Sequence, residues 1–327
     1  MSGGGRWNYL VRRLLQAVPV LLAIAVLNFL MLQLAPGDAA TVLAGEAGSA
    51  SPEYMLQLRQ QFGLDRPLAT QLLFYVKNVL TLNLGFSFRH NMPVLDLIMA
   101  RLWPTLLLMG VTLVVSVTVG IALGLIAAMR LRSWHDAVIS ILALVWYATP
   151  LFWIGLMLIV VFSLKLGWAP TSGMETVAAF HEGWRRVLDI GHHVVLPAVT
   201  LSLFYLALYT RLMRAAVLEQ ANMEYVTTAR AKGLTERRIL LTHILRNAVL
   251  PVVTMAGVQL GSLLGGAIVV ETVFAWPGLG LLAFQSLFAR DLNLLMGIFF
   301  LSTCLVIAIN LAVDLAYTFL DPRIRLA

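Results

Sequence analysis

The chain has 327 residues, of which 60% are apolar and only 12% are charged, and its mean hydropathy is +0.87. An ordinary soluble domain carries about 25% charged residues, so this composition excludes one and indicates an integral membrane protein. The net charge of +7 would suggest a nucleic-acid partner in a soluble chain. Here the basic residues lie between apolar segments, where they set membrane orientation, and we expect no nucleic acid.

The N-terminal part contains one apolar segment and a long connection. Leu14 to Ala35 is too long for the apolar core of a signal peptide, roughly 7 to 15 residues, and is predicted to be a retained membrane helix. Between it and Trp103, the segments Glu53 to Phe62 and Leu68 to Leu82 have proline before their starts and glycine after their ends. This pattern predicts two amphipathic helices in a structured region rather than a linker.

Three further apolar segments follow. Pro104 to Met129 is predicted to be the second span, and Ala137 to Leu164 the third. Pro150 lies in the middle of the third and predicts a kink or a break, because proline removes a helical hydrogen bond. A polar loop over residues 169–193 precedes the fourth span, Val194 to Leu212.

The longest polar interruption between apolar segments is Met223 to Pro251. Seven Lys and Arg lie between Arg211 and Arg246, and only three Glu offset them. Charge alone would be explained by membrane orientation and by binding to anionic lipid. Lipid binding does not explain the small residues Ala229 and Gly233, because it does not require another surface to approach the backbone closely.

A helical pattern occupies the first half of this segment. Val226, Ala229, Arg230 and Gly233 share one face, and the small residues among them would let another surface approach the backbone closely. Gly233 is also typical of a helix stop, and Thr235 of the N-cap of a following helix.

Two more spans complete the chain, Val252 to Val273 and Leu294 to Phe319, separated by a turn at Trp276 to Gly278. Six spans place both termini on one side. Of the 23 Lys and Arg, 14 lie on that side, which the positive-inside rule assigns to the cytoplasm. We therefore expect an all-α polytopic protein with six transmembrane helices and a structured extracytoplasmic region between the first two.

No residue pattern indicates catalysis or nucleotide binding. The GxxxxGK[ST] phosphate-binding pattern does not occur, so energy from ATP would have to come from a partner. The predicted spans contain no His, which argues against an intramembrane hydrolase. A metal site and an ordinary solvated loop are both considered for four residues of the loop over 169–193, but their spacing matches no metal motif: His181, Glu182, His192 and His193.

Glycines recur at helical spacing on two spans. Gly120 and Gly124 lie four apart on the second span, and Gly257, Gly261 and Gly265 form two overlapping GxxxG steps on the fifth. On the fifth span, such steps allow close helix packing, either inside this subunit or against a second subunit. Both alternatives remain open at this stage.

Polar residues within the spans are candidates for function, because such residues are costly in a membrane. For Asp314 we favour an ion pair with Arg211 or Arg214 over a proton relay. For Glu271, at the outer end of the fifth span, we favour a structural or gating contact. Four groups near mid-membrane are candidates for a translocation path, with helix packing as the alternative: Tyr147, Thr149, Gln259 and Ser262.

At several motifs the sequence resembles the permease subunits of ATP-binding-cassette (ABC) importers, in the dipeptide, oligopeptide and nickel branch. The matches extend over nearly the whole length. Those that carry the resemblance are YVTTARAKG at 225–233, RNAVLP at 246–251, VETVFAWPGLG at 270–280 and DPRIR at 321–325. Supporting matches are APGD at 35–38, FGLDRP at 62–67 and LGWAPTSG at 166–173.

The resemblance implies a type I importer permease fold, with residues 1–103 as an N-terminal helix plus extracytoplasmic region and 104–327 as a five-helix core. It implies a cytoplasmic coupling helix, at about residues 223–235, that docks on the ATPase. Gly233 matches the glycine and Ala229 the second alanine of the family's EAA-x3-G pattern, whereas Thr227 and Thr228 replace Glu and Ala. The implied coupling residues are Tyr225, Val226, Ala229, Arg230, Lys232, Gly233 and Leu234.

The implied partners are a second similar permease subunit, two ABC ATPase subunits and an extracytoplasmic binding protein. No cofactor is expected in this chain, because ATP and Mg would be bound by the ATPases, and the chain itself is expected to be no enzyme. The expected location is the bacterial inner membrane, with both termini in the cytoplasm. Residues expected at an outer gate or a binding-protein contact are Glu271, Trp276, Pro277 and Gly278.

The motifs favour peptides as the substrate, with nickel complexes, glutathione or short oligosaccharides as alternatives. An ion-coupled secondary transporter is the alternative of another class, and it would need no ATPase.

Overall fold

The computed structural model describes residues 4–34, 67–87 and 89–320. The predicted helix Glu53 to Phe62 and the DPRIR motif lie outside these residues. The chain forms two compact units, one of Met1–Arg101 with Ala283–Ala327 and one of Leu102–Leu282. The predicted division into 1–103 and 104–327 runs along the sequence and stays a prediction. In the structure, the last helix of the chain lies in the same unit as the first helix.

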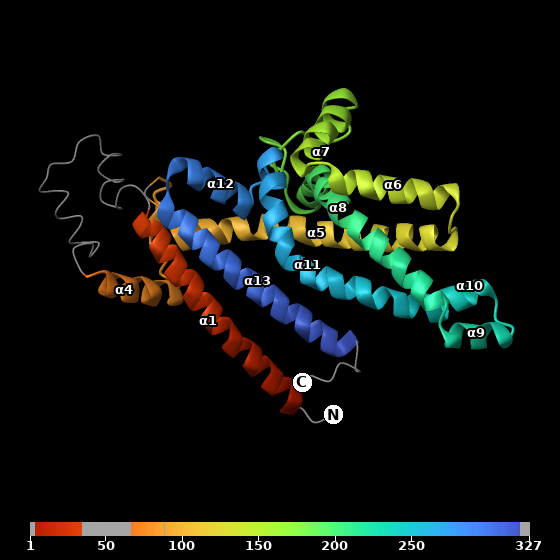
Figure 1. Cartoon of the computed structure of the whole chain (residues 1–327). Coiled ribbons are helices and arrows are strands. Elements are labelled where there is room, and N and C mark those ends of the chain that lie inside the picture. Colours follow the sequence, from red (N-terminus) through yellow and green to blue (C-terminus); the bar gives the residue numbers. More distant parts are fainter. Residues whose placement is uncertain (1–3, 35–66, 88, 321–327) are drawn as a thin grey trace, which may run out of the picture. The chain divides into compact units, whose positions relative to one another are not determined.

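The first unit is built on two long helices, α1 (Gly4–Leu34) and α13 (Leu292–Leu320), which pack side by side (Figure 1). The side chain of Asn28 in α1 donates a hydrogen bond to the Met296 carbonyl of α13 at 3.3 Å. The amphipathic helix predicted for Leu68 to Leu82 is α4 (Leu68–Leu80), which begins directly after Pro67 and packs on α1. A short hairpin of β1 (Phe86–Ser87) and β2 (Met92–Pro93) leads into α5 (Val94–Met129).

The second unit is arranged around α8 (Gly183–Ala221). In its most apolar stretch 72% of the residues are buried, against 17% to 33% for the other long apolar helices. Helices α6 (Trp134–Ala148), α7 (Leu151–Leu158) and α11 (Leu245–Val273) all pack against α8. α7 continues as a short π-helix, η1 (Ile159–Lys165).

Glycines bring α5 onto α8. A Cβ added at Gly120 would lie 2.7 Å from the Tyr209 Cβ, and one added at Gly124 would lie 2.6 Å from the Met213 Cβ. Real side chains do not approach so closely, so both positions require glycine for this packing. The glycine pair on the second span is therefore used inside this subunit.

The third predicted span is broken at Pro150, as expected. α6 ends at Ala148, α7 begins at Leu151, and the two halves meet at an angle of 106°. Among the described residues, five helices are long and apolar enough to cross a membrane, or six if this bent pair counts as one span. The expected polytopic, all-helical architecture is confirmed.

Several helices exceed their predicted bounds. α5 begins ten residues before the predicted start and keeps Pro104 inside, and α8 begins eleven residues early, within the predicted polar loop. The predictions marked apolar runs, whereas helices continue through polar turns while backbone hydrogen bonds persist. The short helix α12 (Leu279–Ala289) was not predicted, because its eleven residues are too few for a span.

Candidate functional site

The basic segment folds into a short helix, a corner and a helix that continues into a long apolar span. α9 (Glu224–Ala231) ends at Gly233, whose φ is +75°. The Gly233 N–H donates to the Arg230 carbonyl at 2.9 Å, and the Leu234 N–H donates to the Ala229 carbonyl at 3.3 Å. These two bonds form a Schellman motif, which needs a left-handed residue at this position. The predicted stop at Gly233 is confirmed.

After the corner, α10 (Glu236–Arg238), a π-helix η2 (Ile239–Ile244) and α11 run on as one long helix. Thr235 occupies the predicted N-cap position, but its side chain makes no capping hydrogen bond. Arg230 instead ties the corner together, with its Nε 2.8 Å from the Glu236 Oε1. Hydrogen bonding to this carboxylate raises the pKa of the Arg230 guanidinium above its ordinary value.

The small-residue face of α9 points into this chain. Val226 is fully buried and Ala229 is 5% exposed, and α9 packs against η2. The surface that approaches Val226 and Ala229 is thus part of this chain, and docking of α9 on an ATPase stays a prediction. They let α9 approach its own chain, because a larger residue at 229 would hold the helix away.

Tyr225 fixes α9 from both sides. Its hydroxyl donates to the Gln220 side chain of α8 at 2.8 Å and accepts from the Asn247 side chain of α11 at 3.2 Å. One phenol group therefore connects α9 to both helices. Sequence reasoning selected Tyr225 from the motif, but not the two partners.

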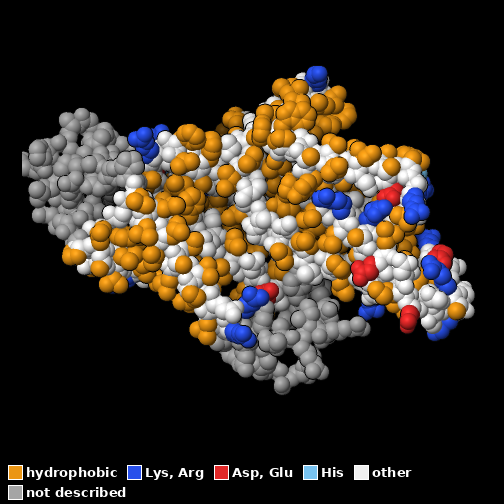
Figure 2. All heavy atoms as spheres, viewed as in Figure 1, with side chains coloured by type: hydrophobic (Ala, Val, Ile, Leu, Met, Phe, Trp, Pro, Cys, Tyr) orange, Lys and Arg blue, Asp and Glu red, His pale blue; other side chains and the backbone are white. Residues whose placement is uncertain are grey.

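The opposite face of α9 is open. Its exposed residues are Glu224, Thr227, Thr228, Ala231 and Lys232. Lys and Arg side chains gather around α9 and α10, whereas hydrophobic side chains cover the long helices (Figure 2). Thr227 and Thr228 give this face two hydroxyl groups.

A second polar cluster surrounds Glu271 at the end of α11. Glu271 is fully buried and accepts a hydrogen bond from the Thr105 hydroxyl of α5 at 2.7 Å. Its other carboxylate oxygen accepts from the Gly280 N–H at 2.6 Å and the Leu281 N–H at 3.1 Å. The carboxylate thus binds the first turn of α12, where backbone N–H groups lack helical partners and negative charge is favoured.

The turn after α11 packs tightly on this carboxylate. Trp276 is fully buried and its indole N–H donates to the Pro104 carbonyl at 2.9 Å. A Cβ added at Gly278 would overlap the Glu271 carboxylate. A direct contact with a binding protein requires exposure that Glu271 and Trp276 do not have, so that part of the prediction is corrected. A gating role stays a prediction.

The candidate path residues fall into two groups. Tyr147 stacks on Phe204 of α8, with ring centroids 5.2 Å apart, and the Arg211 guanidinium lies 4.9 Å from the Tyr147 ring centroid. On α11, the Ser262 hydroxyl donates to Gln259 at 2.7 Å. Thr149 bonds only locally in this structure, to the Val145 carbonyl at 2.6 Å.

Tyr205 links the two groups. Its ring is 5.2 Å from that of Phe204, and its hydroxyl is 3.4 Å from the Ser262 hydroxyl. The sequence did not predict Arg211, Phe204 or Tyr205 at this place: Arg211 was expected to orient the chain or to pair with Asp314, and no pattern distinguishes the two aromatic residues from helix-packing residues.

The glycines of α11 do not share one environment. Gly257 is buried, Gly261 is partly exposed, and Gly265 is exposed with no atom within 4 Å of an added Cβ. The neighbouring Gly266 faces α8 closely, because a Cβ added at this glycine would lie 3.0 Å from the Leu201 side chain of α8. Packing against a second permease subunit at Gly261 and Gly265 stays a prediction.

The predicted ion pair between Asp314 and Arg211 or Arg214 was wrong. Asp314 pairs with Arg13 of α1 at 3.1 Å, whereas Arg214 pairs with Asp136 at the start of α6. Both pairs join residues far apart in the sequence, which residue spacing alone does not reveal.

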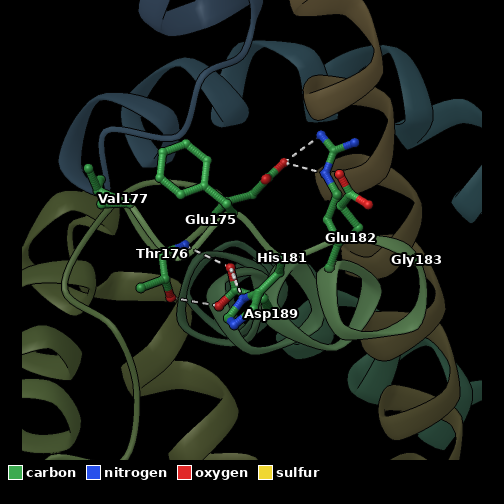
Figure 3. Close-up of a pocket in the computed structure, with 10 residues that line it drawn as sticks. Glu175, Thr176, Val177, His181, Glu182, Gly183 and Asp189 are labelled. Carbon is green, nitrogen blue, oxygen red and sulfur yellow. Dashed lines mark hydrogen bonds and ion pairs between the residues drawn. The ribbon is translucent and has the colours of Figure 1, made fainter.

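The loop before α8 and the first turns of α8 line an open pocket of about 580 Å³, formed by ten residues between Glu175 and Asp189 (Figure 3). The Asp189 carboxylate accepts from the Thr176 N–H and hydroxyl, both at 2.7 Å, and Arg186 pairs with Glu175 at 2.7 Å. His192 is not one of the residues that line the pocket, and its Nε2 lies 2.8 Å from the Trp168 carbonyl oxygen. Among the described residues, no three His, Cys, Asp or Glu lie together as a metal site would require.

Comparison with known proteins agrees with these features. Residues 120–326 match the family described as binding-protein-dependent transport system inner membrane component, and residues 6–109 match the N-terminal part of such components. The chain is 40% identical over 318 residues to the oligopeptide transport system permease protein AppB of Bacillus subtilis. It is equally identical, over the same number of residues, to the glutathione transport system permease protein GsiC of Escherichia coli. Each alignment covers 97% of this chain and 99% of the relative.

The fold is similar to that of a chain in inward-facing structures of the MetNI methionine ABC transporter. The TM-score is 0.55 at 19% identity, over 70% of this chain and 98% of that chain. The buried glycine contacts, the tethered short helix and these full-length matches lead to one assignment. The chain belongs to the family of binding-protein-dependent transport system inner membrane components and is a permease subunit of an ABC importer.

Proposed function

We propose that this chain forms half of a translocation pathway for di- and oligopeptides in the bacterial inner membrane, with both termini in the cytoplasm. A second, similar permease subunit would supply the other half. Two ATPase subunits would bind ATP and Mg, and an extracytoplasmic protein would deliver the substrate. The substrate assignment is supported by relatives named as oligopeptide and glutathione permeases, both of which handle peptide-like compounds.

The observation that carries the coupling proposal is the attachment of α9. Its inner face is buried, Tyr225 joins it to α8 and α11, and its outer face is exposed. A helix held in this way transmits a push from outside to two spans, as required if ATPase closure is to bias the bundle. The coupling surface would consist of the exposed residues Glu224, Thr227, Thr228, Ala231 and Lys232.

Peptide uptake into proteoliposomes containing the complete importer tests the proposed function. We expect uptake that requires ATP and loaded binding protein. Uptake that continues after ATP is exhausted, while the ion gradient is held, would instead indicate a secondary transporter. Glutathione is the second substrate to test, because a relative with 40% identity is named for it.

Substitutions at Gly233 test the coupling role separately. Gly233→Asn keeps a residue that tolerates the left-handed conformation, whereas Gly233→Trp adds bulk and disfavours it. We expect near-normal uptake for Asn and loss of uptake for Trp, with the subunit still inserted in the membrane. Normal uptake and normal ATPase binding by Gly233→Trp would contradict a docking role for this corner.

A further inference from the structure

Arg211 is a basic residue in a largely apolar helix, and no acidic side chain in the described part of the chain pairs with it. It lies in the candidate span Gly183–Ala221, at the predicted cytoplasmic end of the apolar stretch Val194 to Leu212 and ten residues before the helix end, or about 15 Å along the axis. Among the described residues, no carboxylate pairs with it, although Arg214 less than one turn away is paired with Asp136. A charged residue inside a span faces a bundle interior or a water-filled cavity and marks a functional site by default.

The guanidinium of Arg211 is held rather than free. Its Nε donates to the Ala207 carbonyl at 3.4 Å, and its central carbon lies 4.9 Å from the centroid of the Tyr147 ring. Tyr147 is in turn stacked on Phe204 at an interplanar angle of 18°. Arginine stacked on an aromatic ring keeps most of its N–H groups available for a ligand.

Much of this stack is exposed. Arg211 and Ser262 are exposed, 46% of the Tyr147 surface is exposed, and Phe204 is partly exposed. Tyr205, which is buried, connects Phe204 to Ser262, and Ser262 bonds Gln259. One exposed cation and a stacked aromatic pair on α6 and α8 are thus linked through Tyr205 to two neutral hydrogen-bonding groups on α11.

We propose that Arg211, on its Tyr147 platform, binds the C-terminal carboxylate of the transported peptide. The proposal rests on the proposed function. Arginine presents parallel N–H groups that match a carboxylate, and such charge-assisted bonds are about twice as strong as neutral ones. Every unmodified linear peptide carries this carboxylate, so recognition at Arg211 does not depend on side-chain sequence. The neutral groups of Ser262 and Gln259 offer hydrogen bonds that any peptide backbone can use.

The experiment compares uptake of a tripeptide with that of its C-terminal amide. The complete importer is reconstituted in liposomes, and each peptide is supplied on binding protein saturated with it, as checked by direct binding. In Arg211→Gln we expect uptake of the free acid to fall at least about tenfold and uptake of the amide to stay unchanged. Tyr147→Leu keeps the charge of Arg211 but removes the aromatic ring against which it lies. We expect this variant to lower the ratio of acid uptake to amide uptake, but by less than Arg211→Gln does. Arg130→Gln removes an exposed cation from a nearby turn and should leave both rates unchanged.

The alternatives give different results. If Arg211 holds a lipid phosphate or a carboxylate of the partner permease, Arg211→Gln lowers uptake of acid and amide together, and the proposal is overturned. An unchanged acid-to-amide ratio in an assembled complex also overturns it. If the unsubstituted importer takes up neither peptide, the proposed peptide function itself fails, which is distinct from a failure at Arg211.

Discussion

The Arg214 guanidinium donates two hydrogen bonds to the Asp136 carboxylate, at 2.7 and 2.9 Å, and joins the last third of α8 to the first turn of α6. The same carboxylate accepts from the Arg132 N–H at 3.1 Å in the turn between α5 and α6. The Asp136 side chain is 9% exposed and that of Arg214 is 32% exposed. One ion pair therefore orders a turn and connects it to the helix that leads to α9.

Asp136→Asn should lower the stability of the subunit by about 1 to 3 kcal/mol, because it removes the negative charge and one of the two acceptor oxygens that bind Arg214. A double-mutant cycle with Arg214→Gln, followed by thermal unfolding in detergent, measures the coupling energy. The matched control is the exposed pair Arg186 and Glu175, where we expect less than about 1 kcal/mol. Equal coupling energies for the two pairs would contradict the structural role of Asp136.

Gly124→Ala should destabilise the packing of α5 on α8 by about 1 to 3 kcal/mol, because the added Cβ would lie 2.6 Å from both Met213 Cβ and the Thr210 carbonyl. Gly110→Ala on the same helix is the control, since no atom lies within 4 Å of its added Cβ. Its stability should be unchanged or slightly raised. Thermal unfolding of the two purified variants decides between these outcomes, and a Gly124→Ala variant as stable as Gly110→Ala would exclude tight packing here.

Glu271→Leu should destabilise the turn between α11 and α12 by about 1 to 3 kcal/mol, because it leaves the buried Thr105 hydroxyl and two backbone N–H groups without their acceptor. Glu271→Gln keeps one acceptor oxygen and should cost less. Protection of the Gly280 and Leu281 amides against hydrogen exchange is the direct measurement. Glu182→Gln, on an exposed side chain, provides the control. Unchanged protection in Glu271→Leu would show that the carboxylate does not cap α12.

Tyr225→Phe should weaken the transmission from α9 while leaving α9 in place. The substitution removes the hydrogen bonds to Gln220 and Asn247, but it keeps the ring. We expect more ATP hydrolysed per peptide imported, with a loss of about 1 kcal/mol in local stability. Simultaneous measurement of phosphate release and peptide uptake in proteoliposomes gives this ratio. A ratio equal to that of the unsubstituted importer would assign Tyr225 to packing alone.

The local features were predictable from the sequence because they depend on neighbouring residues. Apolar runs long enough for a bilayer predicted membrane helices, Pro150 predicted the break in the third span, and Gly233 predicted the stop of α9. Each of these follows from backbone chemistry within a few residues. Helix ends were less predictable, as at Val94 and Gly183, because amphipathic turns prolong α5 and α8 beyond their apolar stretches.

The pairing of distant groups was decided only by the tertiary structure. The sequence alone determined that this is a helical membrane protein with a basic, glycine-stopped helix between two of its spans. It did not determine that Val226 and Ala229 face inward, that Glu271 caps α12, or that Asp136 rather than Asp314 neutralises Arg214. Nor did it show that Arg211 lies over Tyr147. A charge or a small residue has several compatible partners along the chain, and only the packing of the helices brings one of them within hydrogen-bonding or van der Waals distance.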